Sequence, residues 1–280
     1  MSDAAAPAWC ADAVRRHDHD RYLTALFAPA DRRPALFALY AFNQEIARTR
    51  EIVSEPMLGH IRLQWWREAI GELYAGAPRE HPVLQALAGP VAAGTLPHDA
   101  FAALIDARET DLDDTPPADL AALEAYAAAT SGELSALAMR ALGFESSAAL
   151  AAARAVGTAW ALIGLMRAVA FHAQARRLFL PEELTRDFNL DTGALMELRP
   201  APNLDRVVRA VVDRAAVLLD EARKARAAVA RPARSPLLLA TLADRHLATM
   251  ARADFDVFAL PPAAPPRPLR LLWAHLHGHY

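Results

Sequence analysis

Two long alanine-rich segments, residues 118–142 and 146–175, constrain the fold of this chain more than any other feature. Alanine has the highest intrinsic preference for the α-helix, and a helix that is apolar around most of its circumference belongs inside a protein. Gly143 and a cap signal at Ser146 and Ser147 separate the two segments. The pattern therefore predicts two buried helices inside a helical bundle.

The rest of the chain also favours helices over strands. Hydrophobic residues make up 54% of the sequence, only 11 residues are glycine, and the β-branched and aromatic residues that favour strands are sparse. Apolar residues at helical spacing, with Pro and Gly at the stops, predict further helices over 31–53, 56–75, 81–93, 98–112, a short stretch from 181, 204–229, 237–251 and a last one from 269. No segment is predicted to be a strand, so the expected fold class is all-α.

The chain is expected to form one domain. No fixed-period repeat, glycine-rich phosphate loop or internal linker interrupts residues 21–260. We predict a flexible amino terminus over 1–20, a single helical domain over 21–260, and a Pro-rich linker with a short terminal helix over 261–280.

Charge and cysteine content limit the partners and the compartment. The formal net charge of −3 provides no broad basic field for a phosphate backbone, so no nucleic-acid partner is expected. Cys10, the only cysteine, cannot form an internal disulfide, which suits a reducing compartment. The acidic amino terminus argues against a secretory signal, and the longest apolar run, 155–166, is too short to span a bilayer. We expect a cytoplasmic protein that associates with an inner membrane only peripherally.

Several stretches resemble the squalene/phytoene synthase family. They are 21–23 with 34–42, the LQWWRE stretch at 63–68, the YAAATSGEL stretch at 126–134, and the LIGLMRAVAFHAQARRLFLP stretch at 162–181. These stretches follow the order and spacing of the family across residues 20–260. The resemblance implies the isoprenoid synthase fold, a single helical bundle around a central pocket that holds prenyl diphosphates.

The resemblance also locates the metal site of the family, and most of its aspartates are missing from this chain. In active members two helices each carry two aspartates four residues apart, which places both carboxylates on one helix face. Mg²⁺ ions bridge these pairs to the substrate diphosphate. Here the first pair falls at Ala47 and Glu51, and the second at Ala168 and His172. The resemblance therefore implies no catalytic residue, no metal ligand and no cofactor.

Three stretches resemble one branch of the family, the mitochondrial complex I assembly factors, which keep the fold with a degraded metal site. The stretches are 52–66, 252–258 and 271–280. They imply a noncatalytic assembly or lipid-binding factor, with respiratory complex I subunits as partners and a prenyl lipid or prenyl diphosphate as a candidate ligand of the pocket.

The candidate ligand-binding residues are Tyr40, Arg48, Glu51, Tyr126, Arg167 and Arg177. Of these, Arg167 and Arg177 match the family. Arginine binds phosphate and carboxylate groups bidentately, so arginines that project into one pocket would favour an anionic ligand. The alternative is that Arg48, Arg50, Arg167 and Arg177 are exposed on an outer face or pair with Glu45, Glu51 and Glu55.

Two other functions stay open from the sequence. One is a head-to-head prenyltransferase that makes a squalene- or phytoene-like product and holds Mg²⁺ with other acids, namely Glu45, Glu51, Asp106 and Asp111. The other is a plain structural protein with a closed core. Side chains that converge on one metal would favour the enzyme, and the absence of a pocket would favour the structural protein.

Three smaller features each have two interpretations. The acids at 109–114 are either a displaced Mg²⁺ site or a solvated turn. The histidines at 275, 277 and 279 are either a metal-binding tail or a mobile terminus. The aromatic residues Trp65, Trp66, Phe42 and Tyr74 either line a lipid tunnel or form plain core. We favour the second interpretation of each.

Overall fold

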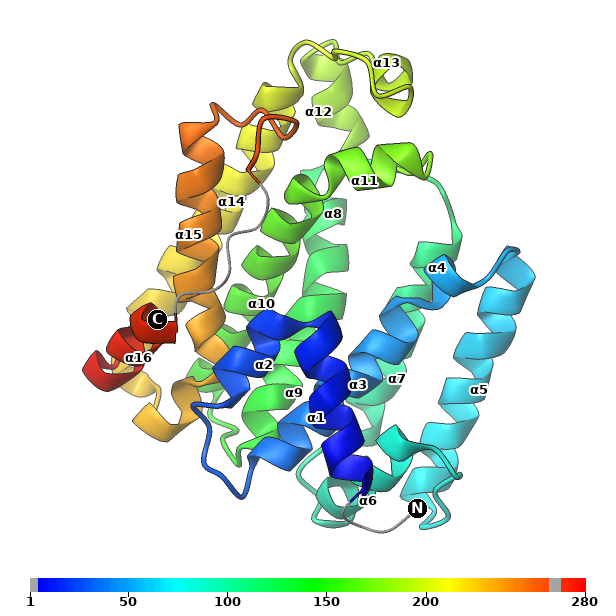
Figure 1. The fold of residues 1–280 in the computed structure, drawn as a ribbon, viewed down its shortest axis with the longest axis vertical. Coiled ribbons are helices and arrows are strands. Elements are labelled where there is room, and N and C mark those ends of the chain that lie inside the picture. Colours follow the sequence, from blue (N-terminus) through cyan, green and yellow to red (C-terminus); the bar gives the residue numbers. More distant parts are fainter. Residues whose placement is uncertain (1–4, 262–267) are drawn as a thin grey trace.

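The structure is a computed structural model that describes residues 5–261 and 268–280 (Figure 1). Within these residues the chain forms helices and turns and no β-strand, which confirms the all-α prediction. The helices are α1 (Ala5–His17), α2 (His19–Ala25), α3 (Arg33–Ala47), α4 (Thr49–Ile52), α5 (Pro56–Tyr74), α6 (Pro82–Ala92), α7 (His98–Glu109), η1 (Thr110–Leu112), α8 (Leu120–Ala127), η2 (Ala128–Gly132), α9 (Glu133–Ala141), α10 (Ser147–Arg167), α11 (Val169–Gln174), α12 (Glu182–Asp187), α13 (Thr192–Met196), α14 (Leu204–Lys224), η3 (Arg226–Ala228), η4 (Arg231–Arg234), η5 (Pro236–Leu238), α15 (Leu239–Arg252) and α16 (Pro268–His277).

The second alanine-rich segment forms α10, the central helix of the bundle. This helix begins at an N-cap serine, Ser146, whose hydroxyl accepts a hydrogen bond from the backbone N–H of Ala149. It packs against α9, α14, α15 and η2. Among the described helices it alone is long and apolar enough to cross a membrane, yet 61% of its most apolar window is buried inside the protein. Its apolar surface therefore serves the core.

The first alanine-rich segment forms α8 and α9 with one π-helical turn, η2, between them. This turn differs from the uninterrupted helix that the sequence predicts. The central helix α10 approaches it so closely that a Cβ atom on Gly157 would lie 2.3 Å from the carbonyl oxygen of Ser131. Only glycine therefore fits at this crossing.

Two hydrophobic cores share the bundle. One gathers residues of α10, α14 and α15, and the other gathers residues of α3, α5, α6 and α7. Helix α9 lies between them, because its Met139 belongs to the first core and its Leu137 to the second. Two faces of the alanine-rich helix α9 thus join the two cores into the single bundle that the sequence predicts.

Both helices that carry the aspartate positions of the family are broken at those positions. Helix α3 ends at Ala47 and α4 begins at Thr49, with Arg48 between them at a ψ of 4°. Helix α10 likewise ends at Arg167, and Ala168 has a ψ of 7° before α11 begins. The sequence predicts continuous helices here, and nothing in its local pattern signals the breaks.

The amino terminus differs from the expected flexible segment. Residues 5–17 form α1, which packs against α3 and α6 and buries Cys10 and Val14 completely. Burial raises the pKa of the Cys10 thiol to about 12, so this thiol is unreactive at neutral pH. At the other end the short terminal helix is present as α16, while most of the expected Pro-rich linker, 262–267, lies outside the described residues.

Two glycines of α10 allow a matched test of this packing. Gly157→Ala places its methyl group against the backbone of η2, whereas Gly164→Ala meets no atom within 4 Å. We expect Gly157→Ala to lower the free energy of unfolding by roughly 1–3 kcal/mol through overpacking. Gly164→Ala should raise it by up to about 1 kcal/mol, because alanine favours the helix.

Urea denaturation followed by far-ultraviolet circular dichroism measures both changes. If the two variants shift the unfolding midpoint in the same direction and to the same extent, the close crossing of α10 and η2 is not a determinant of stability.

Candidate functional site

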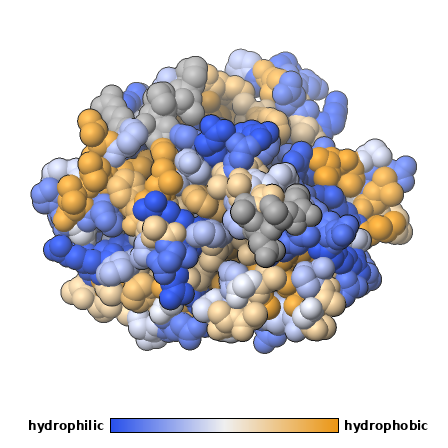
Figure 2. Space-filling view, turned by 60° about the horizontal axis from the view of Figure 1, so that its bottom comes forward, coloured by the Kyte–Doolittle hydropathy of each residue, from blue (hydrophilic) through white to orange (hydrophobic). Residues whose placement is uncertain are grey.

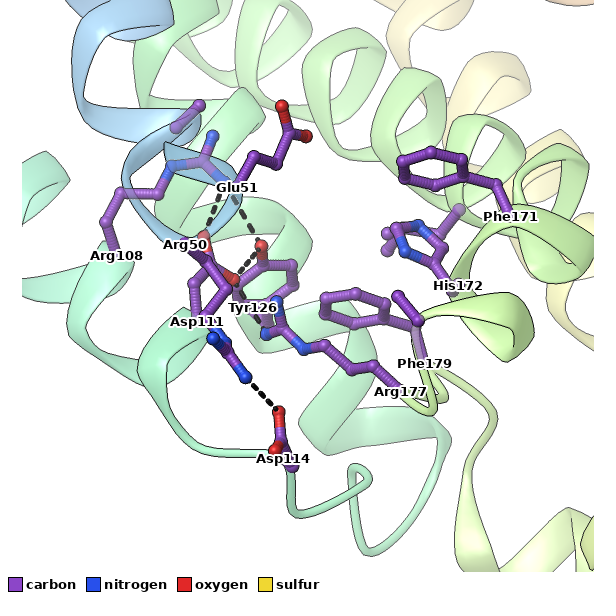
Figure 3. Close-up of a pocket in the computed structure, with 13 residues that line it drawn as sticks. Arg50, Glu51, Arg108, Asp111, Asp114, Tyr126, Phe171, His172, Arg177 and Phe179 are labelled. Atoms are coloured by element: carbon purple, nitrogen blue, oxygen red, sulfur yellow. Dashed lines mark hydrogen bonds and ion pairs between the residues drawn. The ribbon is translucent and has the colours of Figure 1, made fainter. Parts of the chain in front are cut away.

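A cavity of about 550 Å³ opens where α3, α4, α7 and η1 face α10 and α11 (Figure 3). It is lined by Ala47, Arg50, Glu51, Arg108, Asp111, Asp114, Tyr126, Leu165, Phe171, His172, Ala175, Arg177 and Phe179. This cavity is the central pocket that the family resemblance implies. Its presence removes the basis for a structural protein with a closed core.

Positions of the missing aspartates lie on opposite sides of this cavity. Ala47 and Glu51 line it from α3 and α4, and His172 lines it from α11. Figure 3 shows Glu51 and His172 facing each other across the open space. Ala168 lies at the break between α10 and α11 and is not part of the lining. Of the four positions to which the resemblance assigns aspartates, only Glu51 carries a carboxylate.

A network of ionic hydrogen bonds forms one wall of the cavity around Asp111. The carboxylate accepts from Arg108 at 3.2 Å, from Arg177 at 3.0 Å and from the Tyr126 hydroxyl at 2.7 Å. Arg108 also donates to the Tyr126 oxygen at 3.1 Å. The side chain of Asp111 is 7% exposed, so these bonds are shielded from water.

Arg177 links this network to the aromatic part of the lining. Its guanidinium carbon lies 4.3 Å from the ring centroid of Phe179, in a cation–π contact. The ring of Phe179 in turn lies 4.9 Å from that of His172. Burial, and then the nearby Arg177 charge, lower the pKa of His172 to about 4. The imidazole is consequently neutral at physiological pH, and it adds no charge to the cavity.

The charges along the cavity wall balance. Three arginines and three carboxylates line it. Arg108 and Arg177 share Asp111, and Arg50 lies 3.4 Å from Asp114 at the exposed rim. Arg50 and Arg177 thus project into one pocket, as expected if the arginines bind an anionic ligand. Their partners are Asp114 and Asp111, not the glutamates Glu45, Glu51 and Glu55.

The six candidate ligand-binding residues do not all meet in this cavity. Glu51, Tyr126 and Arg177 line it. Tyr40 is buried in the core, with Arg21 5.9 Å from its ring centroid. Arg48 is exposed and lines neighbouring hollows near α1.

Arg167 also lies away from the cavity lining. Its guanidinium is hydrogen bonded to His246 of α15 at 3.3 Å. It therefore joins α10 to α15, although the family resemblance includes it in the pocket.

Arg108 is a cavity residue that the sequence analysis missed. It lies three residues before Asp111, a spacing at which side chains meet on a helix, so the pair could have been found from the predicted helix over 98–112. The contacts of Asp111 with Tyr126 and Arg177 could not have been found from the sequence, because these residues lie 15 and 66 positions from Asp111.

The residues present do not suit Mg²⁺. That ion prefers carboxylates in octahedral geometry, whereas the cavity offers alanine and a neutral imidazole at the motif positions. The four acids of the enzyme alternative do not converge either. Glu45 pairs with Arg62 at 2.6 Å, and Asp106 pairs with Arg67 at 2.6 Å. Within residues 5–261 and 268–280 no group of three or more His, Cys, Asp or Glu side chains could hold a metal.

The smaller features also have clear positions. Asp113 accepts from the backbone N–H and the hydroxyl of Thr115, as a turn residue does. Trp66 is buried against Phe42 in the core, while Trp65 is 37% exposed beneath Arg79. Neither tryptophan lines the cavity.

A second, mainly apolar hollow of about 360 Å³ shares part of this wall. Tyr126, Arg177 and Phe179 line both spaces. The additional lining consists of Ala107, Thr110, Thr115, Pro117, Ala122, Ala125, Ala129 and Leu178.

Comparison with known proteins agrees with the fold. The sequence matches the squalene/phytoene synthase family model over residues 14–273. It is 30% identical over 250 residues to NADH dehydrogenase (ubiquinone) complex I, assembly factor 6, of Mus musculus, covering 89% of this chain and 75% of the relative. Identity to the Homo sapiens protein is 29% with the same coverage.

A crystal structure of a dehydrosqualene synthase in complex with ligand superposes with a TM-score of 0.84, covering 98% of this chain and 96% of the other, at 18% identity. This likeness confirms the isoprenoid synthase fold. The chain therefore belongs to the squalene/phytoene synthase family, and within that family it is similar to the complex I assembly factors.

Proposed function

We propose that this protein is an assembly factor for respiratory complex I that has kept the synthase fold and does not catalyse prenyl transfer. The single observation that carries the proposal is the lining of the cavity, where Ala47 and the neutral His172 occupy positions that need Mg²⁺ ligands. The similarity to complex I assembly factor 6, which extends over 89% of the chain, supports the choice of client.

Prenyl transfer requires positive charge that this cavity does not supply. Departure of a diphosphate develops negative charge, and bound Mg²⁺ ions neutralise it. A cavity with balanced charges and one unpaired motif carboxylate, Glu51, lacks the ligands to hold these ions. Loss of metal charge raises the barrier by several kcal/mol, and each ~1.4 kcal/mol slows the reaction about tenfold.

For the same reason the ligand of the cavity is proposed to be an uncharged, apolar lipid rather than a prenyl diphosphate. Arg108 and Arg177 are already paired with Asp111, so a diphosphate would have to displace a buried carboxylate from two guanidinium groups. The apolar part of the lining, Leu165, Phe171, Ala175 and Phe179, suits a hydrocarbon chain. Among the candidate residues, Glu51, Tyr126 and Arg177 would contact such a ligand.

The proposed location is the cytoplasmic side of an inner membrane, with peripheral attachment. The buried free thiol of Cys10 is compatible with a reducing compartment. Among the helices that the structure describes, α10 alone has the length and apolar content of a membrane span, and most of its apolar surface is buried within the bundle.

We predict that the purified protein does not catalyse prenyl transfer. Purified protein incubated with farnesyl or geranylgeranyl diphosphate and Mg²⁺ or Mn²⁺ should release no squalene- or phytoene-type hydrocarbon, because no carboxylate clamp holds the metal. Gas chromatography of the lipid extract measures the product, and an active phytoene synthase provides the positive control. A metal-dependent hydrocarbon product would refute the noncatalytic assignment.

The second prediction concerns the client. Deletion of the gene in its native host should lower the amount of assembled complex I and leave carotenoid and hopanoid levels unchanged. Native gel electrophoresis with in-gel NADH dehydrogenase staining measures the complex. The deletion strain is complemented in parallel with the unmodified gene and with a variant that carries carboxylates at two motif positions, Ala47→Asp with His172→Asp. Loss of prenyl lipids with normal complex I would show that the protein acts in isoprenoid synthesis.

The third prediction concerns the charge balance around Asp111. Asp111→Asn leaves two buried guanidinium groups without a counter-charge, so it should lower the free energy of unfolding by roughly 3–5 kcal/mol and increase the affinity for inorganic pyrophosphate. Asp114→Asn is the matched control, because its pair with Arg50 is exposed and should contribute less than about 1 kcal/mol.

Chemical denaturation and isothermal titration calorimetry with pyrophosphate measure both effects, with excess pyrophosphate stabilising a marginal Asp111→Asn protein. Tight binding of pyrophosphate by the unmodified protein would show that Asp111 does not neutralise the cavity.

A further inference from the structure

The outward face of α16 is apolar. Leu269, Leu272, Trp273 and Leu276 are 79%, 42%, 56% and 61% exposed, and their spacing places them in one stripe along the helix. Leu271 and Ala274, on the opposite side, are buried and hold the helix against the bundle. A helix on a protein surface normally presents polar side chains to water, and within residues 5–261 and 268–280 nothing covers this stripe.

The space-filling view agrees with this description. Figure 2 shows hydrophobic residues gathered at the left edge of the molecule, on the side where Figure 1 places α16. Hydrophilic residues adjoin this hydrophobic area.

Two segments of the chain near this stripe contain arginines and no acids. Residues 222–243 and 257–280 contain no aspartate or glutamate, although the whole chain has a formal net charge of −3. Arg226 contacts His279 at 2.5 Å, and Arg234 donates to the carbonyl oxygen of Gly278 at 2.7 Å. These contacts hold the arginines beside the carboxyl end of α16.

The cations next to α16 lack counter-charges within the protein. In the part of the chain that the structure describes, Arg226, Arg231, Arg234 and Arg270 form no ion pair with a carboxylate. Arg223 in the same region is already paired with Asp244 at 2.8 Å. An anionic partner is therefore the one that complements this surface.

Trp273 supplies an interfacial side chain. Its ring stacks on His277 at 4.5 Å and on His279 at 5.6 Å between centroids, and it remains 56% exposed. Tryptophan favours the boundary between hydrocarbon and polar headgroups, because its ring is apolar and its N–H is polar.

We propose that α16 is a membrane-docking helix that lies in the headgroup plane of an anionic lipid bilayer. Its leucine and tryptophan stripe enters the acyl boundary, and the neighbouring arginines contact lipid phosphates. This inference does not depend on the choice of complex I as client or on the absence of prenyl transfer.

The dimensions of the helix set the strength of this attachment. A helix of 10 residues with four apolar side chains on its exposed face buries too little surface for stable anchoring on its own. The arginines contribute through electrostatic attraction, which salt screens. Binding should therefore be reversible, should require anionic lipid and should weaken as the ionic strength rises.

Another exposed apolar stripe, on α5, provides a matched control. Met57, Ile61 and Trp65 are 65%, 59% and 37% exposed at a spacing of four residues. The cations near it are paired, Arg62 with Glu45 and Arg79 with Glu72. It therefore matches the α16 stripe in exposure but not in charge.

The test is cosedimentation of the full chain with vesicles of equal parts phosphatidylcholine and phosphatidylglycerol, compared with pure phosphatidylcholine. The protein should bind the anionic vesicles. Leu276→Glu should weaken this binding by about tenfold or more, because it places a charge in the acyl boundary and repels the phosphates. Ile61→Glu, at nearly equal exposure, should not change it.

A second pair of variants tests the charges separately. Arg231→Gln with Arg270→Gln should weaken binding to the anionic vesicles by about tenfold or more, since each arginine near such a surface is attracted to the lipid phosphates. Arg15→Gln with Arg16→Gln, which removes the same charge from α1, should leave binding unchanged. Circular dichroism spectra should be the same for all variants, because every substituted side chain is exposed.

Three results would overturn the proposal. They are the absence of binding to anionic vesicles, equal binding to pure phosphatidylcholine, and equal loss of binding in the Leu276→Glu and Ile61→Glu variants.

Discussion

The shared carboxylate of Asp111 determines the character of the central cavity. It accepts hydrogen bonds from Arg108, Arg177 and Tyr126, which come from α7, the segment after α11, and α8. Two guanidinium groups in a mostly buried wall would repel each other without it. Asp111 offsets one of these two charges and Glu51 adds a further carboxylate, so arginines and carboxylates along the cavity are equal in number. The aromatic and alanine side chains opposite line the open space.

This wall supports the proposal that the protein has kept the fold of a synthase without its chemistry. In the family reaction, metal ions held by facing carboxylates supply the charge that the leaving diphosphate requires. Here alanine and an uncharged histidine occupy those positions, and the helices that carry them are interrupted at Arg48 and Ala168. The fold depends on different residues, chiefly the close crossing of α10 over η2 at Gly157, so the site can change while the bundle persists.

The cavity and the surface around α16 obey different physical constraints. The arginines that line the cavity lie beside carboxylates, because a buried charge without a partner is costly. The surface around α16 leaves its arginines unpaired, which water and external anions tolerate. This separation fits the two proposals, an uncharged ligand in the cavity and an anionic lipid surface against α16.

The sequence by itself determined the helical class, the order of the helices, the family and the missing aspartates. The helical class and the order of the helices follow from local spacing and composition, which a single chain displays directly. The family and the missing aspartates follow from the resemblance of several stretches to known members. It also placed an N-cap serine at the start of α10 and the terminal helix near residue 269.

Only the tertiary structure decided which charges meet. Arg177 reaches Asp111 across 66 residues, and Arg167 pairs with His246 across 79 residues instead of entering the cavity. It also decided that residues 5–17 form a packed helix, which buries its own Cys10, and that the apolar stripe of α16 faces outward. The physical reason is that burial and pairing depend on neighbours far away in sequence, and helical periodicity shows which residues share a face without showing what that face contacts.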